Sequence, residues 1–301
     1  YYLTLEPTVS FWDCGEYIST AFKLEVGHPP GAPLFQIFGR FFSLFATDTS
    51  QVAFMINLMS AFFSALTILF LFWTITALSK KIILKSAELT QSNVIAILGS
   101  GLVGSLAYTF SDSFWFSAVE GEVYGMSSFF TAITFWCILK WESEAEDKYS
   151  SRWIVLISFI IGLSIGVHLL NLLAIPAVIF IYYFKKHTSS PKGILFVFLI
   201  AVIMTGGIQG IIIPGIVSLA GKFELFFVNS IGLPFNSGTI VYFALIISVI
   251  IFGLLASKKN NKPIVGMGLV SFAFILIGYS TFFILVIRSN ANPPIDENNP
   301  E

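Results

Sequence analysis

Long apolar segments alternate with short polar ones along most of the chain. Apolar runs of roughly 18 or more residues are typical of helices that cross a lipid bilayer. We therefore predict an all-α polytopic membrane protein with about eight spans. The expected spans are Val52–Leu78, Val94–Phe110, Val123–Leu139, Trp153–Leu170, Leu172–Phe184, Ile194–Ile213, Thr239–Ala256 and Ile264–Ile287.

The apolar stretch Trp153–Phe184 could form one helix or two. One helix would be about 48 Å long, whereas the hydrocarbon core of a bilayer is about 30 Å thick. With two helices and a tight turn near Gly166–Asn171, alternate polar loops hold 12 of the 16 Lys and Arg residues. The positive-inside rule then places these loops, 79–93, 140–152, 185–193 and 257–263, in the cytoplasm. The remaining polar segments, including Lys222 on a loop, face the periplasm.

Composition supports a membrane protein and excludes several other classes. The chain is 56% hydrophobic and 11% charged, whereas a soluble domain has about 25% charged residues. The net charge of −1 gives no reason to expect nucleic-acid binding, and the two cysteines do not form a disulfide framework.

We divide the chain into three parts. Residues 1–50 contain the end of a first span and a long outer loop, residues 51–287 form the transmembrane bundle, and residues 288–301 begin a second outer segment. The first and last residues read as the end of a helix and the start of a loop, so we expect a fragment of a longer protein.

The outer loop begins with the stretch "SFWDCGEYI", which contains two carboxylates. The spacing of Asp13 and Glu16 places both on one face of a helix. Asp13 is a candidate general base or metal ligand, and neighbouring aromatic residues can raise its basicity by desolvation. The alternative is that Asp13 only caps a short helix, where the backbone dipole favours an acid.

The rest of this loop carries a histidine and an arginine. His28 lies in "VGHPPGAP", whose prolines and glycines predict a rigid loop without helix. The following stretch, "PLFQIFGRFFSLF", is too short to span a bilayer and predicts a helix along the membrane interface that carries Arg40.

A second acidic cluster lies in the next outer loop, "SDSFWFSAVEGEVYGMSS". Glu120 and Glu122 flank a glycine at the expected start of a span, and Tyr124 follows them. We assign these three residues and His28 to sugar or acceptor binding. Asp112 is equally well explained as a solvated loop residue.

Few cations are expected on the outer face. Arg288 and His168 lie at the outer ends of spans, at the depth of a lipid headgroup, and Arg40 lies on the interface helix. We predict that these three bind a phosphate, with Arg288 first, because its planar guanidinium matches phosphate oxygens. Snorkelling is the alternative for Arg288, and a structural hydrogen bond at a turn is the alternative for His168.

Four stretches in order carry a resemblance: "TVSFWDCGEYI", "GHPPGAPLF", "FWFSAVEGEVYGMSSFF" and "GVHLLNLLAIP". They are similar to a bacterial membrane-protein family, common in Bacteroidetes, that is related to the animal protein O-mannosyltransferase transmembrane protein 260. The long acidic outer loop with an interface helix also resembles the GT-C class of membrane glycosyltransferases.

The resemblance implies a GT-C-like bundle and roles for particular residues. Asp13 would be the catalytic base with Glu16 beside it, and the donor would be a polyprenyl-phosphate sugar. Glu120 and Glu122 would correspond to the second acidic motif of the class. His168 stands where related enzymes often have lysine, which departs from the pattern for binding phosphate.

We therefore expect an inverting glycosyltransferase in the bacterial inner membrane, active on the periplasmic face. Its acceptor would be a Ser or Thr hydroxyl of an exported protein. No ligand spacing indicates a metal, although a divalent ion is compatible with the chemistry, and no other cofactor is predicted. The alternatives are a transporter, disfavoured because no charged residue lies in the middle of a span, and a noncatalytic envelope-assembly protein.

Overall fold

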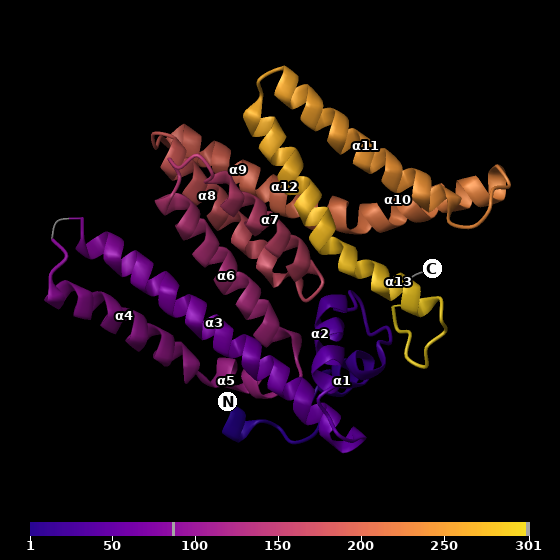
Figure 1. Ribbon diagram of the computed structural model, residues 1–301, viewed down its shortest axis with the longest axis horizontal. Helices are drawn as coiled ribbons and strands as arrows, with labels where there is room; N and C mark the ends of the chain where they lie inside the picture. Colours follow the sequence, from indigo (N-terminus) through magenta and orange to yellow (C-terminus); the bar gives the residue numbers. More distant parts are fainter. Residues whose placement is uncertain (86–87, 299–301) are drawn as a thin grey trace.

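The computed structural model describes residues 1–85 and 88–298 (Figure 1). In this part of the chain the structure is helical and contains no β-strand, only an isolated bridge between Val26 and Asp296. The α-helices are α1 (Cys14–Lys23), α2 (Pro33–Ser43), α3 (Val52–Ile83), α4 (Gln91–Thr109), α5 (Asp112–Val119), α6 (Val123–Ser143), α7 (Ser151–Ile165), α8 (Ala174–Lys186), α9 (Pro191–Gly207), α10 (Ile213–Leu225), α11 (Ser237–Lys259), α12 (Pro263–Tyr279) and α13 (Phe283–Ser289).

Within residues 1–85 and 88–298, seven helical segments are long and apolar enough to cross a membrane. The eighth apolar helix, α7, has 15 residues, shorter than a typical span. These segments confirm the prediction of a polytopic helical membrane protein. The seven are Thr49–Ile83, Gln91–Thr109, Val123–Ser143, Leu169–Lys186, Pro191–Ser230, Ser237–Lys259 and Pro263–Ser289.

The ambiguous stretch 153–184 forms two helices, α7 and α8, as the positive-inside pattern predicted. The chain turns at Gly166–His168 and continues through a 3₁₀ segment, Leu169–Leu173. The Gly166 carbonyl accepts a hydrogen bond of 2.7 Å from the Leu34 amide at the start of α2. This bond fastens the turn to the N-terminal region.

The segment after α9 differs from the prediction. We expected a loop carrying Lys222, but helix continues from Pro191 to Ser230 through two π-helical segments, Ile208–Ile212 and Phe226–Ser230. Lys222 therefore lies on α10. Sequence periodicity missed this helix because polar and glycine residues interrupt the apolar run, although none of them prevents helical hydrogen bonding.

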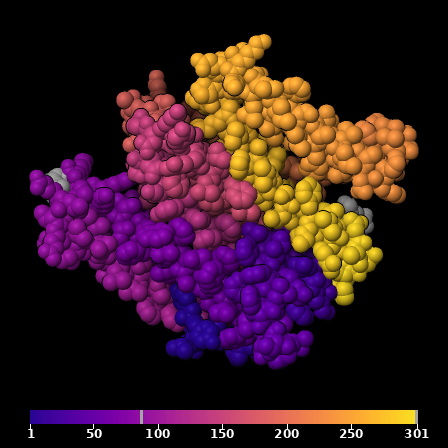
Figure 2. Space-filling model, viewed as in Figure 1, coloured from indigo at the N-terminus to yellow at the C-terminus, as the bar shows by residue number. Residues whose placement is uncertain are grey.

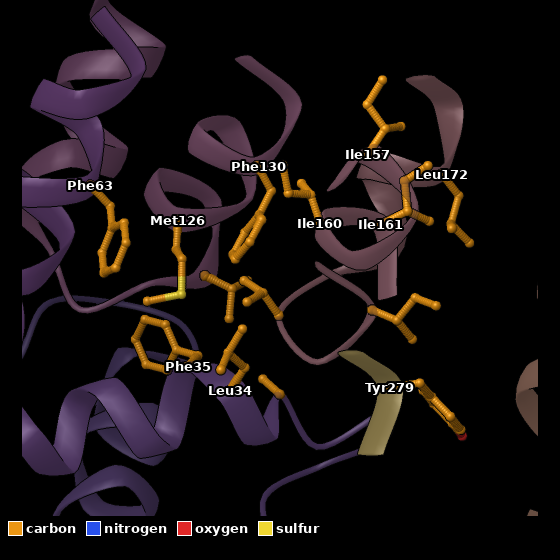
Figure 3. Close-up of a cluster of buried hydrophobic side chains, with 14 of the residues drawn as sticks. Leu34, Phe35, Phe63, Met126, Phe130, Ile157, Ile160, Ile161, Leu172 and Tyr279 are labelled. Atoms are coloured by element: carbon orange, nitrogen blue, oxygen red, sulfur yellow. The ribbon is translucent and has the colours of Figure 1, made fainter. Parts of the chain in front are cut away.

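The first 50 residues fold against the ends of the long helices. Leu34 and Phe35 of α2 extend into a cluster of buried apolar side chains that also contains Phe63 of α3 and Met126 and Phe130 of α6 (Figure 3). Phe35 and Met126 are fully buried. The prediction of a short helix after the proline-rich loop is thus confirmed, and the packing fixes its position relative to α3 and α6.

Two arginines donate hydrogen bonds to backbone carbonyls at the C-terminal end of α1. Arg288 of α13 donates hydrogen bonds to the Leu24 carbonyl at 2.5 Å and the Lys23 carbonyl at 3.3 Å. Arg40 of α2 donates one of 2.7 Å to the Phe22 carbonyl. Cations at a helix C-terminus satisfy its free carbonyls and its negative dipole end. The space-filling view shows the N-terminal and C-terminal segments in contact (Figure 2).

The two ends of the bundle carry opposite charge. We call the end formed by α1, α2, residues 111–122 and the 166–168 turn the acidic end. At the other, basic end, ion pairs form at the helix ends and in the adjoining loops: Lys81 with Glu142, Arg152 with Glu144, and Lys186 with Glu146. The α11–α12 turn, at the top of Figure 1, lies away from α1, α2 and α5.

The charge distribution generates a topological prediction. We expect Phe235→Cys, in the α10–α11 connection, to react with a membrane-impermeant thiol reagent in intact cells. Asn260→Cys, in the α11–α12 turn, should react only after lysis. Phe235 is 82% exposed, and the native Cys14 and Cys137 are fully buried, which keeps the background low. The opposite labelling pattern would place the acidic end in the cytoplasm.

The contacts of Arg288 generate a second prediction. We expect Arg288→Ala to lower the free energy of unfolding by about 1–3 kcal/mol, because it leaves carbonyls at the end of α1 without their charged donor. Thermal unfolding in detergent measures the change, and Lys23→Ala is the control because that side chain is exposed. Unchanged stability together with weaker donor binding would instead favour a phosphate-binding role.

Candidate functional site

Asp13 occupies the N-cap position of α1, but its side chain makes no capping hydrogen bond. Only its backbone carbonyl participates in the helix, where it accepts a bond of 2.9 Å from the Tyr17 amide. The side chain is exposed to solvent. This geometry weakens the capping alternative and leaves the carboxylate available to a substrate.

Glu16, one turn further along α1, holds the proline-rich loop. It accepts a bond of 2.6 Å from the His28 amide, and its carboxylate oxygens lie 2.9 and 3.0 Å from His28 Nδ1. A side chain at Gly27 would collide with Glu16, since its Cβ would lie 2.6 Å from Oε1. Glycine thus permits the close approach of the loop backbone to the carboxylate.

The charge state of His28 follows from these contacts. Partial burial lowers the pKa of His28, but the hydrogen bond and the charge of Glu16 raise it, with smaller contributions from Asp13 and Glu297. The net result is a pKa above the usual value for histidine. His28 is therefore protonated up to a higher pH than an ordinary histidine, and in the protonated form both ring nitrogens are donors.

Glu120 and Glu122 lie where α6 begins, packed against α1. They are 4% and 5% exposed, and the Cys14 thiol donates a hydrogen bond of 3.7 Å to Glu122 Oε1. Burial, and then the charges of these two glutamates, raise the pKa of the Cys14 thiol. Cys14 thus remains a protonated donor, and it joins α1 to the second acidic motif.

Burial also changes the ionisation of the two glutamates. It raises the pKa of Glu122 to about 7, and the charges of Glu120 and Asp13 add to the effect, against hydrogen bonds from the Val123 amide and Cys14. Burial likewise raises the pKa of Glu120, opposed by hydrogen bonds from Ser10 and Cys14. Protonated Glu122 is therefore accessible near neutral pH.

Tyr17 lies close both to the Glu16–His28 pair and to Glu122. Its ring centroid is 5.5 Å from that of His28, and burial raises its pKa, followed by the charges of Glu122, Asp13 and Glu16. Residues from α1, the proline-rich loop and the start of α6 therefore form one electrostatically coupled cluster. We call Asp13, Cys14, Glu16, Tyr17, His28, Glu120 and Glu122 the acidic cluster.

His168 and Tyr124 lie together at the acidic end, with ring centroids 5.6 Å apart. His168 Nδ1 accepts a hydrogen bond of 3.2 Å from the Leu170 amide, so the proton of the neutral ring is on Nε2. Burial lowers the pKa of His168. This histidine can therefore donate one hydrogen bond to a ligand, but it is a weak source of positive charge.

A groove of about 600 Å³ extends from Tyr124 between α3, α4 and α6. Apolar side chains and hydroxyls line it, among them Leu71 and Thr74 of α3 and Ser127 and Thr131 of α6. Tyr124, one of the lining residues, lies next to His168. The groove thus connects the acidic end with the apolar part of the bundle.

The predicted site residues fall into two groups. The structure brings Asp13, Glu16, His28, Glu120 and Glu122 together in the acidic cluster, with Tyr124 and His168 close to each other at the same end. Arg40 and Arg288 instead contact the far end of α1, about 15 Å from Asp13 along a ten-residue helix. Asp112 is the exposed first residue of α5.

Sequence reasoning missed Cys14 and the lining of the groove. A single cysteine beside two acids gave no signal for its contact with Glu122, which lies 108 residues away in sequence. The groove residues do follow a helical period, as in Thr67, Leu71 and Thr74, but a stripe of this kind also occurs in ordinary helix packing. Among the residues that the structure describes, no group of three or more His, Cys, Asp or Glu side chains is arranged to hold a metal ion.

Two curated relatives are similar to part of the chain. The Protein O-mannosyl-transferase tmem260 of Dictyostelium discoideum is 32% identical over 134 residues, which are 44% of this chain and 14% of the relative. The Protein O-mannosyl-transferase TMEM260 of Mus musculus is 28% identical over 163 residues, 54% of this chain and 21% of the relative. No solved structure gives a significant match.

A family model also matches, over more than half of the chain. It describes the Protein O-mannosyl-transferase TMEM260 N-terminal domain and covers residues 13–191. This range begins at Asp13 and includes every residue of the acidic cluster, together with Tyr124 and His168, whereas Arg288 lies outside it. The chain therefore belongs to the TMEM260 N-terminal domain family.

Proposed function

We propose that this chain is the catalytic part of a GT-C-type glycosyltransferase that transfers a sugar from a polyprenyl phosphate to a protein hydroxyl. The names of its relatives support transfer to protein, and mannose is the sugar that those names specify. The observation that carries the proposal is the uncapped, exposed carboxylate of Asp13 at the edge of the acidic cluster.

Asp13 is the general base in this mechanism. Its carboxylate accepts the proton of a Ser or Thr hydroxyl as that oxygen attacks the anomeric carbon. The new C–O bond forms while the bond to the phosphate oxygen breaks, and the polyprenyl phosphate leaves with the electron pair. Direct displacement from the opposite face inverts the anomeric centre.

Glu122 and His28 bind the substrate in complementary ways. With a pKa of about 7, Glu122 can donate a hydrogen bond to a sugar or acceptor oxygen while Asp13 accepts one. Two carboxyl groups with different environments can thus take opposite roles. His28, held by Glu16, supplies a donor from its free ring nitrogen. Glu120 and Tyr124 complete the predicted contacts with sugar and acceptor.

The groove beside Tyr124 supports a donor with a lipid tail. Its apolar lining between α3, α4 and α6 suits an isoprenoid chain, and its lining residue Tyr124 lies next to His168, which can donate a hydrogen bond to a phosphate. We therefore assign the phosphate to His168 first. Arg288 and Arg40 are secondary candidates, because backbone carbonyls of α1 already engage both side chains.

The active site on this reading faces the periplasm or an equivalent lumen, and the multi-pass chain lies in the inner membrane. The positive-inside distribution of Lys and Arg supports this orientation. An exported protein would then meet its lipid-linked sugar donor at the acidic end, where water and the bilayer meet.

The role of Asp13 can be tested directly. We expect Asp13→Asn to reduce sugar transfer roughly 100-fold or more, since the amide keeps the shape but cannot accept the proton. Transfer from polyprenyl-phosphate mannose to exported proteins is measured with the whole protein, and binding of the donor should be nearly unchanged. Asp112→Asn is the matched control, because it removes an exposed outer acid away from the acidic cluster. Native rates in the Asp13 variant would refute the proposal.

The ionisation of Glu122 predicts how stability depends on pH. The folded protein keeps this proton up to about pH 7, whereas the unfolded chain releases it near the ordinary glutamate pKa of 4.5. The protonated Glu122 therefore contributes fully to the free energy of unfolding below pH 4.5, and this contribution is lost as the pH rises through about 7. We expect thermal unfolding to show Glu122→Gln gaining stability relative to the native protein between about pH 5.5 and about pH 8. If the stability difference between Glu122→Gln and the native protein does not vary with pH, burial does not keep the Glu122 carboxyl protonated.

A further inference from the structure

A second groove lies at the basic end, on the same helices that form the groove beside Tyr124. It has a volume of about 350 Å³. Trp73 and Lys80 of α3 and Trp136 and Lys140 of α6 contribute its largest side chains, and Ile97 of α4 completes one wall. These residues lie where α3 and α6 leave the apolar part of the bundle, which is the level of lipid headgroups.

Hydrogen-bond donors predominate among the polar groups of this groove. The two lysines contribute ammonium groups, and neither indole N–H, of Trp73 or Trp136, has a hydrogen-bond partner in the described part of the chain. The Thr76 hydroxyl donates to the Trp73 carbonyl within α3. No Asp or Glu is among the described residues that line the groove, so it is complementary to an anion.

The two lysines differ in their surroundings. Lys80 is exposed and forms no ion pair with any carboxylate of residues 1–85 and 88–298. Its neighbour Lys81 is paired with Glu142, on the adjacent helix. Lys140 lies 3.3 Å from Glu144, but that carboxylate also accepts a bond of 2.7 Å from Arg152. The groove therefore keeps a net positive charge.

The two tryptophans give the groove an apolar wall beside these charges. Their ring centroids are 5.6 Å apart, which brings α3 and α6 together at this level. Trp73 is 38% exposed, so part of its ring is left for a ligand. An indole surface next to ammonium groups matches a molecule in which an apolar chain is attached to a negatively charged phosphate.

We propose that this groove binds the phosphate headgroup of an anionic phospholipid from the leaflet at the basic end. The phosphate would lie between the ammonium groups of Lys80 and Lys140. The part of the acyl chain nearest the headgroup would contact Trp73 and Ile97. This site is separate from the acidic cluster and independent of the proposed transferase activity. Bound lipid would link α3, α4 and α6 at the end opposite the acidic cluster.

The test uses matched pairs of lysines on the same side of the membrane. Native mass spectrometry of the detergent-solubilised protein measures retention of phosphatidylglycerol against phosphatidylcholine. We expect Lys80→Gln with Lys140→Gln to weaken phosphatidylglycerol binding about 10- to 30-fold. Lys258→Gln with Lys259→Gln removes the same charge from the end of α11, outside the groove, and should change binding by less than about twofold.

A single substitution guards against a loss of structure. Lys80→Gln disturbs no ion pair and should alone weaken binding about fivefold, with unchanged thermal unfolding. Equal weakening by both double variants would overturn the proposal in favour of general attraction to anionic lipid, as would no weakening by either. Displacement of the lipid by inorganic phosphate at similar concentrations would also overturn it, because the groove would then recognise a free anion.

Discussion

The burial of Glu122 against α1 is the contact on which the acidic end depends. Its hydrogen bond with Cys14 joins two segments 108 residues apart in sequence. Burial of the carboxyl away from water raises its pKa to about 7, although the hydrogen bond from Cys14 opposes this rise. Since Asp13 precedes Cys14 directly, the position of the exposed carboxylate follows from the position of the buried one.

Two further contacts keep α1 in place. Glu16 holds the His28 loop at its N-terminal half, and Arg288 and Arg40 hold the carbonyls at its C-terminus. The apolar side chains of α2 then extend into the core shared by α3 and α6 (Figure 3). A segment with many ionisable groups is thus positioned by charge-assisted hydrogen bonds at both ends and by apolar packing along its side.

Much of this arrangement could be predicted from the sequence. Apolar runs located the helices, and the distribution of lysines separated α7 from α8 where length alone left two choices. The proline-rich loop and the helix after it also followed from local chemistry. By contrast, the helical run from Pro191 to Ser230 was missed, because local polarity suggested a loop around Lys222.

Long-range contacts explain what the sequence could not supply. Nothing local indicates that Arg288 reaches the carbonyls of α1, 264 residues earlier in the chain, or that Cys14 contacts Glu122. Depth in the membrane suggested Arg288 as a phosphate ligand, but depth does not reveal the partners that the fold provides. His168 retained its proposed role because the α7–α8 turn brings it to Tyr124.

The claim that the acidic end transfers sugar is tested most directly by following the anomeric carbon of the donor. The whole protein would be incubated with polyprenyl-phosphate mannose labelled with ¹³C at the anomeric position, together with exported proteins. Nuclear magnetic resonance should show the label in a glycosidic bond to Ser or Thr, with inverted configuration. Retained configuration, or label that remains on the phosphate, would contradict the account.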